Sequence, residues 1–415
     1  MNSTTLYQQI LGLRSPWRVA DVKLDLPGKL VEVRVVDDAL ALHECPCCGK
    51  ACPGYDHRVR QWRHLDTCQM QTILTADVPR VNCPEHGVLQ AKVPWAEPGS
   101  RFTALFEAMV IDLLRVTSIK AVADHVKLSW DQVDGIMARA VQRGLARREA
   151  KPVTRLGVDE TSFQRRHEYV TVVSDQTRGI VLHVADDRKT SILSSYYESL
   201  PPAHLSGIEL VSMDMWGPYI TATERALPDG GRKIAFDKYH VAAHLTKAVD
   251  SVRRREHAAL LREGDDRLKK TRFDWLRNPS THDRIKEREG FEALRDSNLQ
   301  TARAWRMKEA AMDVWEHTDE SNVRAMWKWW CGWAHRSRLE PMRRVGRMIK
   351  SHLQGIVTAI LQRATNAGAE SINSRIQRVK SMACGFRNRQ RFRNAIYFHM
   401  GGLDLLPEGV THTKV

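Results

Sequence analysis

The sequence predicts an α/β fold: a mixed sheet joined to an N-terminal metal-binding module, a helix-turn-helix module and an all-helical insertion. Three observations lead to this prediction. Strand patterns, interrupted by one helix, run between residues 155 and 236, which is typical of an α/β sheet. Six of the eight cysteines precede residue 90. Seven of the twelve tryptophans lie between Trp275 and Trp333, in a stretch of helical periodicity.

Composition narrows the class of protein. Of the 415 residues, 42% are hydrophobic and 27% are charged, which is typical of a soluble globular chain with two or three domains. The apolar stretch near Met109–Leu114 is far too short to cross a bilayer. The first ten residues lack the pattern of a secretory signal. We therefore expect neither a membrane protein nor a secreted one.

Positive charge is concentrated near the C-terminus. The net charge is +15, and residues 334–400 contain 14 Lys and Arg residues but only two acids, Glu340 and Glu370. Most of these cations are arginines, whose planar guanidinium groups pair well with phosphates. The segment predicts contact with nucleic acid, and a solvated helix face is the alternative. The candidate phosphate contacts are Arg375, Arg378, Lys380, Arg387, Arg389 and Arg391.

Two pairs of metal-binding side chains lie within residues 1–98. Cys45 and Cys48 occur in the sequence CPCCG, and Cys83 and His86 occur in CPEHG. Each pair spans a turn that proline and glycine favour, and the two pairs together supply the four ligands of a structural Zn²⁺ site. A set of reduced, unligated thiols is the alternative. The rival ligands are Cys47, Cys52, Cys68, His43, His57 and His64.

Hairpins and helices are expected around these pairs. Alternation after Leu26 predicts a hairpin that includes Leu30–Val35, and a short hairpin such as Met70–Val78 fits between the two ligand pairs. Apolar periodicity then predicts three helices, at Phe102–Arg115, Ser118–Val126 and Ser129–Gly144.

The three helices are typical of a helix-turn-helix module, here residues 99–150. The joint Lys127–Ser129 is tight, Ser129 is a suitable N-cap, and Ser129–Ala138 would face the DNA groove. An ordinary helical hairpin is the alternative. The candidate DNA contacts here are Ser129, Trp130, Gln132 and Arg139.

After Pro152 the pattern changes to that of a sheet. The expected elements are the strands Arg155–Asp159, His167–Val173 and Gly179–Val184, the helix Ser191–Leu200, and the strands Ile208–Asp214 and Lys233–Phe236. Helices are expected from His240 to about Trp333, and again at Ile349–Ile360 and Ala369–Val379.

Carboxylates stand at the expected ends of two strands. Asp159 ends the first strand and Asp214 ends the fourth. A carboxylate at the end of a buried strand is costly unless it meets water or a cation. Two such groups on neighbouring strands suit Mg²⁺ or Mn²⁺. Glu370, in a helix with basic surroundings, is the candidate third acid, although each acid taken singly is compatible with a structural role such as a salt bridge.

Taken in order, these motifs resemble the DDE transposases of bacterial insertion sequences, and within them the ISL-three family. CPCCG and CPEHG resemble the family's zinc knuckles, and GVDETS around Asp159 and SMDMWGPY around Asp214 resemble its catalytic strands. FDKYHV, residues 236–241, resembles its fifth-strand motif, and NAGAESIN, residues 366–373, resembles the helix of its third acid. CGFRN, residues 384–388, resembles its closing motif, in which tyrosine is more usual than Phe386.

The resemblance covers nearly the whole chain and implies a fold and an activity. The fold is an RNase H-like catalytic core in two parts, residues 151–242 and residues 345–415 with basic C-terminal helices, around a helical insertion at residues 243–344. The activity is that of a DNA transposase, which binds the terminal inverted repeats of an insertion sequence, cleaves strands and transfers them to a target. The implied location is the bacterial cytoplasm, on the nucleoid.

The resemblance also implies roles for site residues. Asp159, Asp214 and Glu370 would hold two Mg²⁺ or Mn²⁺ ions, with Asp237 and His240 as accessory residues, and the zinc would be structural. The implied partners are double-stranded DNA, as transposon ends and target, and a second copy of the chain in a homodimer on DNA. The tryptophan cluster would serve mainly as core, with stacking on an unpaired base as the alternative.

Three other functions remain compatible with parts of this pattern. A zinc and helix-turn-helix repressor would explain the first 150 residues but not the strand-end acids. A metal-dependent nuclease or resolvase on the same fold would keep the acids without strand transfer. A degenerate transposase that only binds DNA would have no need to retain Asp159, Asp214 and Glu370.

Overall fold

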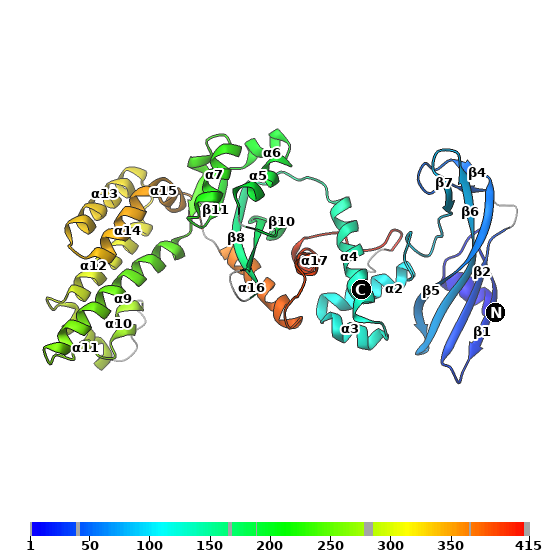
Figure 1. Ribbon diagram of the computed structural model, residues 1–415, viewed down its shortest axis with the longest axis horizontal. Coiled ribbons are helices and arrows are strands. Elements are labelled where there is room, and N and C mark those ends of the chain that lie inside the picture. The colour runs from blue at the N-terminus through cyan, green and yellow to red at the C-terminus, as the bar shows by residue number, and fades with distance from the viewer. Residues whose placement is uncertain are drawn as a thin grey trace. The chain divides into compact units, whose positions relative to one another are not determined.

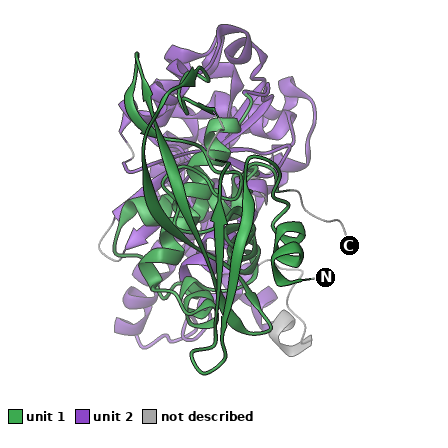
Figure 2. Ribbon diagram, turned by 90° about the vertical axis from the view of Figure 1, so that its right-hand side faces the viewer, with its two compact units in different colours: residues 1–149, 381–415 green, residues 150–380 purple. Residues whose placement is uncertain are grey.

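The computed structural model describes residues 2–38, 42–164, 168–187, 189–277, 285–364 and 367–410. The chain forms two compact units, which Figure 2 distinguishes by colour. Unit 1 comprises Met1–Glu149 and Ser381–Val415, and unit 2 comprises Ala150–Lys380. The C-terminal segment from Ser381 therefore groups with the N-terminal modules, whereas the sequence analysis assigned all of residues 345–415 to the catalytic core.

Unit 1 contains a five-stranded sheet in the order β1-β2-β6-β5, with β7 paired to the end of β6 (Figure 1). Its strands are β1 (Arg18–Asp25), β2 (Leu30–Val36), β5 (Gly54–Thr67), β6 (Met70–Cys83) and β7 (Gly87–Gln90). A separate small hairpin pairs β3 (His43–Glu44) with β4 (Ala51–Cys52), and α1 (Ser3–Ile10) precedes the sheet. Buried side chains of the sheet and α1 form one hydrophobic core.

Of the two hairpins expected in this region, the one that includes Leu30–Val35 is confirmed, but Met70–Val78 is not a hairpin: these residues all belong to one strand, β6. β1 and β2 pair antiparallel across the turn 26–29, and β5 and β6 pair antiparallel over 14-residue strands. The turn of the β5–β6 hairpin lies before Met70, and its residues Cys68 and Gln69 both have positive φ, at 51° and 66°. Two left-handed residues match the right-handed twist of the strands that they join. The chain can therefore reverse without splaying these long strands.

The three expected helices of unit 1 are confirmed within a few residues. They are α2 (Ala104–Val116), α3 (Ile119–Val126) and α4 (Trp130–Arg147). The side chains of Thr103, Ser118 and Ser129 each accept a hydrogen bond from a backbone N–H of the first helical turn. Lys127 ends α3 in the left-handed conformation. These local interactions set the short joint between α3 and α4.

The C-terminal segment returns to pack against α4. Helix α17 (Arg389–Met400) and the tail after it lie along α4, and Arg143 donates a 2.5 Å hydrogen bond to the Leu405 carbonyl oxygen. Gly144 permits this approach, because a Cβ there would lie 2.7 Å from the Leu403 Cβ. The tail thus buries a face of α4 that would otherwise meet water.

Unit 2 is built on a five-stranded sheet in the order β10-β9-β8-β11-β12. Its strands are β8 (Arg155–Gln164), β9 (Glu168–Asp175), β10 (Ile180–Ala185), β11 (Leu210–Met213) and β12 (Ile234–Phe236). β9 runs antiparallel to both of its neighbours, whereas β8, β11 and β12 run parallel to one another. All five expected strands are therefore present, although His167, the expected start of the second, lies outside the described residues.

Asp159 does not end its strand, so that part of the sequence prediction is wrong. The parallel pairing of β8 with β11 stops at Val158, but the antiparallel pairing with β9 continues to Gln164. The sequence of one strand shows where its run of apolar residues ends, but it does not show how far the neighbouring strand continues to pair with it. Because β9 pairs with β8 up to Gln164, β8 is longer than expected.

Helices cover the sheet of unit 2. They are α5 (Thr190–Glu198), α6 (Pro202–Gly207), α7 (Gly217–Ala226), α8 (Gly230–Lys233), α15 (Leu353–Leu361) and α16 (Ala367–Met382). The helix expected at Ile349–Ile360 is in fact divided at His352. Gly355 lets α15 approach β12 closely, because a Cβ there would lie 2.4 Å from the Phe236 ring.

The helical insertion forms the rest of unit 2 (Figure 1). It contains α9 (Lys238–Arg262), α10 (Arg272–Leu276), α11 (Ile285–Arg295), α12 (Gln300–Asp313), the 3₁₀ helix η2 (Val314–Glu316), α13 (Glu320–Arg336) and α14 (Glu340–Ser351). Trp275, Trp327 and Trp330 are fully buried in a core continuous with that of the sheet. Among the helices of the described ranges, none has the length and apolar character that a membrane span requires.

Candidate active site and metal-binding residues

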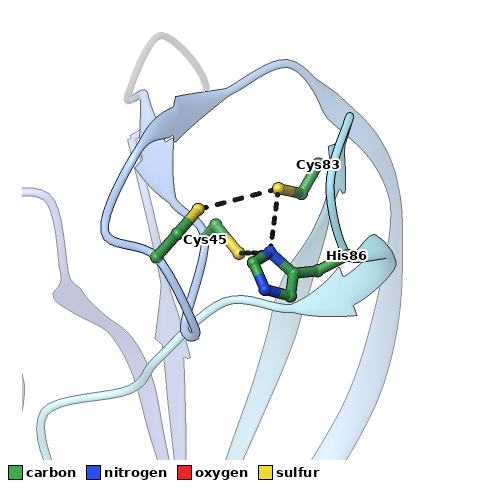
Figure 3. A group of neighbouring side chains, drawn as sticks. Cys45, Cys83 and His86 are labelled. Carbon is green, nitrogen blue, oxygen red and sulfur yellow. Dashed lines mark hydrogen bonds between the residues drawn. The ribbon is translucent and has the colours of Figure 1, made fainter.

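The four predicted zinc ligands lie together in unit 1. Figure 3 shows Cys45, Cys83 and His86 pointing toward one another, and the ligand atoms of these three and of Cys48 all lie within 4.8 Å of each other. The His86 Nδ1 atom is 3.5 Å from the Cys83 Sγ and 3.8 Å from the Cys45 Sγ, and the Cys48 and Cys83 sulfurs are 3.8 Å apart. A tetrahedron of zinc ligands has edges of about 3.3–3.8 Å. The donor set and its spacing therefore fit zinc.

Backbone hydrogen bonds form a turn that holds Cys45 and Cys48 close together. The Gly49 N–H donates to the Cys45 carbonyl oxygen, and the Cys45 N–H donates to that of Lys50. The second pair sits in the turn between β6 and β7, where the hydrogen bond with His86 lowers the pKa of the Cys83 thiol to about 6. A more acidic thiol is a better metal ligand, because the thiolate is the form that binds.

Of the rival ligands, Cys52 is buried beside Cys45 and Cys83, and the others that follow lie apart from this group. Cys47 and Cys68 are exposed, and Cys52 is buried with its thiol against the Lys50 carbonyl oxygen at 3.3 Å. His43 pairs with Asp37, and His64 is buried beside Thr103. Within the described residues, Cys45, Cys48, Cys83 and His86 form the group that meets the spacing of a metal site.

In unit 2, three aspartates stand in a row where the parallel pairing of the strands ends. Val158 of β8, Met213 of β11 and Phe236 of β12 are paired in register. The residues that follow them are Asp159, Asp214 and Asp237. The carboxyl edge of parallel strands is where α/β sheets bind ligands, so the register alone brings two predicted catalytic acids and one accessory residue to the same edge.

Asp159 lies on the face of the sheet that α16 covers. Its Oδ2 accepts a 2.6 Å hydrogen bond from the Asn373 side chain, and its Oδ1 accepts one from the Glu160 N–H. Burial, with a smaller contribution from the charge of Asp214, raises the pKa of Asp159 to about 6. Glu160 faces the opposite side, where the Tyr219 hydroxyl of α7 donates to it at 3.2 Å.

Asp214 is more accessible than Asp159. Its carboxylate is 48% exposed and lies 3.2 Å from the Nδ1 of His240, which is in the first turn of α9, three residues after Asp237. The Met215 N–H also donates to it at 2.9 Å. His240 thus lies beside the acid row, which is our name for Asp159, Asp214 and Asp237, as expected for an accessory residue.

A stripe of side chains fixes α16 along β8. Asn373 contacts Asp159, the Gln377 amide donates to the Thr161 hydroxyl at 3.0 Å, and the Lys380 ammonium donates to the Ser162 carbonyl oxygen at 2.8 Å. Spacings of three and four residues place these side chains on one helix face. Glu370, three residues before Asn373, belongs to the same face and stands at its N-terminal end.

Glu370 is exposed and lines a pocket of about 700 Å³ that Asp237 also lines. Among the described residues, Asp159, Asp214 and Glu370 do not form a group as close as the zinc ligands. The structure therefore brings Asp159 and Asp214 together and sets Glu370 at the neighbouring pocket. Asn366, the start of the quoted third-acid motif, lies outside the described residues.

The comparisons with known proteins agree with this arrangement. Residues 156–396 match a transposase family, and residues 91–141 match the helix-turn-helix domain of transposase family ISL3. Residues 41–86, which include all four zinc ligands, match the zinc-finger of the transposases of IS204, IS1001, IS1096 and IS1165.

The chain belongs to the ISL3 family of transposases. This transposase is 28% identical over 422 residues to the transposase for insertion sequence element IS1557 of Mycobacterium tuberculosis, with 94% of each chain covered. It is 24% identical over 373 residues to the transposase for IS1001 of Bordetella parapertussis, with 88% of this chain and 90% of that one covered. The resemblance drawn from the motifs is confirmed.

The side chains predicted to contact DNA differ in the structure: some are paired with other protein groups, and others are exposed. Ser129 and Gln132 bond each other's backbone in a capping box, and Arg139 pairs with buried Glu107 at 2.5 Å. Arg391 pairs with Asp131 and Asp134, and its guanidinium lies 4.5 Å from the centre of the Trp130 ring. These side chains thus have structural partners. Among the other candidates, Arg378 and Arg387 are exposed and Arg389 is partly buried, whereas Arg375 donates to the Gly179 carbonyl oxygen and Lys380 to that of Ser162.

Sequence analysis missed the residues that hold α16 of the transposase in place. Asn373 and Gln377 are ordinary polar residues in a helix, and only their contacts with Asp159 and Thr161 give them a role. The signal that could have found them is their spacing from Glu370, since residues 370, 373 and 377 share one helix face.

Proposed function

We propose that this transposase cleaves DNA at the ends of an insertion sequence and joins the freed 3′ ends to target DNA, with Asp159, Asp214 and Glu370 holding divalent cations. The observation that carries the proposal is the register of β8 with β11, which sets two aspartates side by side at the carboxyl edge of the sheet. The match to a transposase family supplies the substrate class.

We infer that the sheet of unit 2 is RNase H-like. In order of chain, its strands are arranged 3-2-1-4-5, and the second runs antiparallel to the others. In this arrangement the first and fourth strands are central neighbours, so the acids after them share one edge. The helical insertion then enters between β12 and α15.

The donor set fits Mg²⁺ or Mn²⁺. Three carboxylates offer hard oxygen ligands, and these two metals prefer such ligands over nitrogen or sulfur. When bound, a pair of such cations would activate the attacking oxygen and stabilise the leaving oxygen at phosphorus. Asn373 orients the Asp159 carboxylate, and His240 holds one oxygen of Asp214.

The other modules supply recognition and stability in this proposal. Zinc held by Cys45, Cys48, Cys83 and His86 would be structural, because four protein ligands leave no open position for substrate. The helix-turn-helix would read the terminal inverted repeats, and exposed arginines such as Arg378 would contact phosphates. Two ends must be brought together, so we expect a homodimer on DNA.

An excision assay in cells tests the proposal. A marker flanked by the DNA that borders the gene would be supplied with the wild-type chain, with Asp214→Asn or with Glu370→Gln. We expect wild type to excise the marker and each variant to lose at least about 1,000-fold of the activity, because each removes a charged ligand. Glu198→Gln, which changes an exposed acid on α5 of the same unit, is the matched control.

The variants separate the parts of the proposal. Excision by Glu370→Gln at the wild-type level would exclude Glu370 as the third acid while leaving the transposase function intact. Absence of excision by wild type, with salt-sensitive binding of the ends retained, would contradict the catalytic function itself.

A further inference from the structure

A buried cysteine beside the zinc ligands has no part in the four-ligand site described above. Cys52 is 3% exposed and shares a cluster of buried side chains with Cys45 and Cys83. Its thiol donates to the Lys50 carbonyl oxygen at 3.3 Å, as only a protonated thiol can. Within the described residues, the group whose ligand atoms all lie within 4.8 Å of one another does not include it. Cys52 is therefore a sulfur that a structural zinc does not require.

Strand register places Cys52 directly across from Cys83. Gly54 of β5 is paired with Val81 of β6, and the preceding residue of β5 is joined to the following residue of β6 by a backbone hydrogen bond of 3.0 Å. Cys52 precedes Gly54 by two residues, and Cys83 follows Val81 by two residues. The same antiparallel register thus sets the two cysteines opposite each other, and β4, which contains Cys52, packs against β6.

The spacing of opposed residues suits a disulfide. Directly opposed residues of antiparallel strands have side chains on the same face and Cα atoms about 4.5–5.5 Å apart. Disulfides span Cα separations of about 4.4–6.8 Å, so these two sulfurs can bond with little movement of the backbone. Cys45 is placed differently, because the pairing of β3 with β4 sets His43 opposite Cys52 and leaves Cys45 two residues away.

We propose that Cys52 and Cys83 form a site of reversible oxidation, at which a peroxide joins them in a disulfide and zinc is released. The inference rests on the zinc-binding part of the proposed function, because Cys83 is a metal ligand there. The disulfide removes the thiolate that Cys83 would give to the metal, and three of the four ligands remain. Because the thiolate is the form that binds, the affinity for zinc falls.

Hydrogen peroxide is the oxidant in this step. The Cys83 thiolate attacks one peroxide oxygen, an S–O bond forms, the O–O bond breaks, and the departing hydroxide takes a proton from solvent and becomes water. The Cys52 thiol then attacks the Cys83 sulfur, an S–S bond forms, the S–O bond breaks, and the departing hydroxide takes the thiol proton as water. Two electrons pass from the two sulfurs to the peroxide. The short strands β3 and β4 have few apolar contacts, so brief local opening admits a molecule of this size.

Treatment of the zinc-saturated, full-length protein with hydrogen peroxide tests the proposal. Zinc release is followed with a chromogenic chelator, and disulfides are mapped by mass spectrometry after free thiols are blocked. Trypsin cleaves after lysine and arginine, so Cys52 and Cys83 fall in separate peptides, residues 51–58 and 81–92, with one cysteine each. We expect these two peptides to become joined in proportion to the zinc released, and a thiol reductant with added zinc to restore the original zinc content.

Cys52→Ser isolates the role of this sulfur, because a serine hydroxyl can still donate to the Lys50 carbonyl oxygen. The variant should bind zinc as wild type does before oxidation. It should then lose zinc to peroxide at least about threefold more slowly, because Cys83 has no thiol directly opposite with which to form a disulfide. Cys47→Ser, which changes an exposed thiol nearby, should form the joined peptides as wild type does.

Disulfides confined to the four zinc ligands in wild type would overturn the proposal, as would zinc release from Cys52→Ser at the wild-type rate. If Cys52→Ser does not hold zinc, the peptide map of the wild-type protein decides alone. Absence of zinc from the wild-type protein before oxidation would overturn the zinc site and this inference together. The excision assay described above reports on the transposase function separately, so the two kinds of failure can be distinguished.

Discussion

A buried histidine joins the sheet of unit 1 to the first helix of the helix-turn-helix region. His64 of β5 is 3% exposed, and its Nδ1 lies 2.9 Å from the hydroxyl of Thr103, the N-cap of α2. Burial, and to a smaller extent the charge of Arg63, lowers the pKa of His64 to about 4. The folded state therefore holds this imidazole neutral over the mildly acidic range.

We predict that unit 1 loses stability as pH falls from about 6.5 toward 4. In this window the unfolded chain, with a histidine pKa near 6.5, binds a proton that the folded chain does not, so acid favours unfolding by up to about 3 kcal/mol. Denaturant titrations of zinc-saturated protein at several pH values measure the effect.

His64→Gln is the matched variant for that measurement. It retains a polar side chain without a titrating group, so its stability should fall less steeply over the same pH window. Protonation of the zinc ligands contributes equally to both proteins and cancels in the comparison. Equal slopes for the two proteins would show that His64 is not the group responsible.

Asn373 illustrates how a neutral residue positions a charged one. Its amide is 2.6 Å from the Asp159 Oδ2 and leaves the Oδ1 to the backbone N–H of Glu160. We predict that Asn373→Ala slows DNA cleavage about 10–100-fold, as is usual when a residue that orients a metal ligand is removed. A cleavage time course on end DNA provides the rate.

The neighbouring exposed residue supplies the control. Ser374→Ala alters the same turn of α16 on its solvent side and should cleave as wild type. End binding should be unchanged in both variants. If Asn373→Ala cleaves normally, Asp159 does not need this hydrogen bond for its orientation.

At the scale of elements, the short hairpins around the zinc ligands have little core of their own. β3 and β4 have two residues each, and the buried side chains around them are Cys45, Cys52, Cys83 and Val81. So few apolar contacts do not hold such a segment without a metal. We therefore expect bound zinc to provide most of the stability of this segment.

We predict one zinc ion per chain and unfolding of this segment when zinc is removed. Cys48→Ser should bind less than one zinc and lower the melting temperature of unit 1. Cys47→Ser, which changes the exposed neighbouring thiol, should retain a full equivalent. Elemental analysis and thermal melts measure both quantities. A full equivalent of zinc in Cys48→Ser would reassign that ligand to another side chain.

At the scale of the whole molecule, the chain leaves unit 1 after residue 149 and returns to it at residue 381. The returning segment is tied to α4 by several contacts. Arg147 pairs with Asp404 at 3.0 Å, Arg148 donates to the Gly401 carbonyl oxygen, and Arg391 bridges Asp131 and Asp134. The helix-turn-helix is therefore completed by residues that lie more than 200 positions away in sequence.

We predict that deletion of residues 381–415 destabilises α4. Without α17 and the tail, buried faces such as that around Gly144 would meet water, and the local opening free energy would fall. Hydrogen exchange of the α4 amides, compared with those of β8 in the same sample, measures this. Unchanged protection of α4 in the truncated chain would show that the N-terminal segment suffices.

Much of this arrangement could be read from local patterns. The helices of the helix-turn-helix follow from their periodicity and from capping residues such as Ser129, whose partners are three residues away. The zinc ligands could be chosen because each pair spans a single turn. The strands of unit 2 follow from short apolar runs. In each case the interactions that decide the structure are between near neighbours in sequence.

The sequence by itself thus determined the kinds of element and the family, and it proposed the ligand pairs and the catalytic acids. Only the tertiary structure decided that β8 continues past Asp159, that Asp237 stands level with Asp214, that Asn373 reaches Asp159, and that residues 381–410 complete unit 1. Each of these depends on which distant segments pair and in which register. Strand pairing and helix packing depend on burying the whole apolar face of each strand or helix against another segment. A local sequence pattern does not show which segment that is.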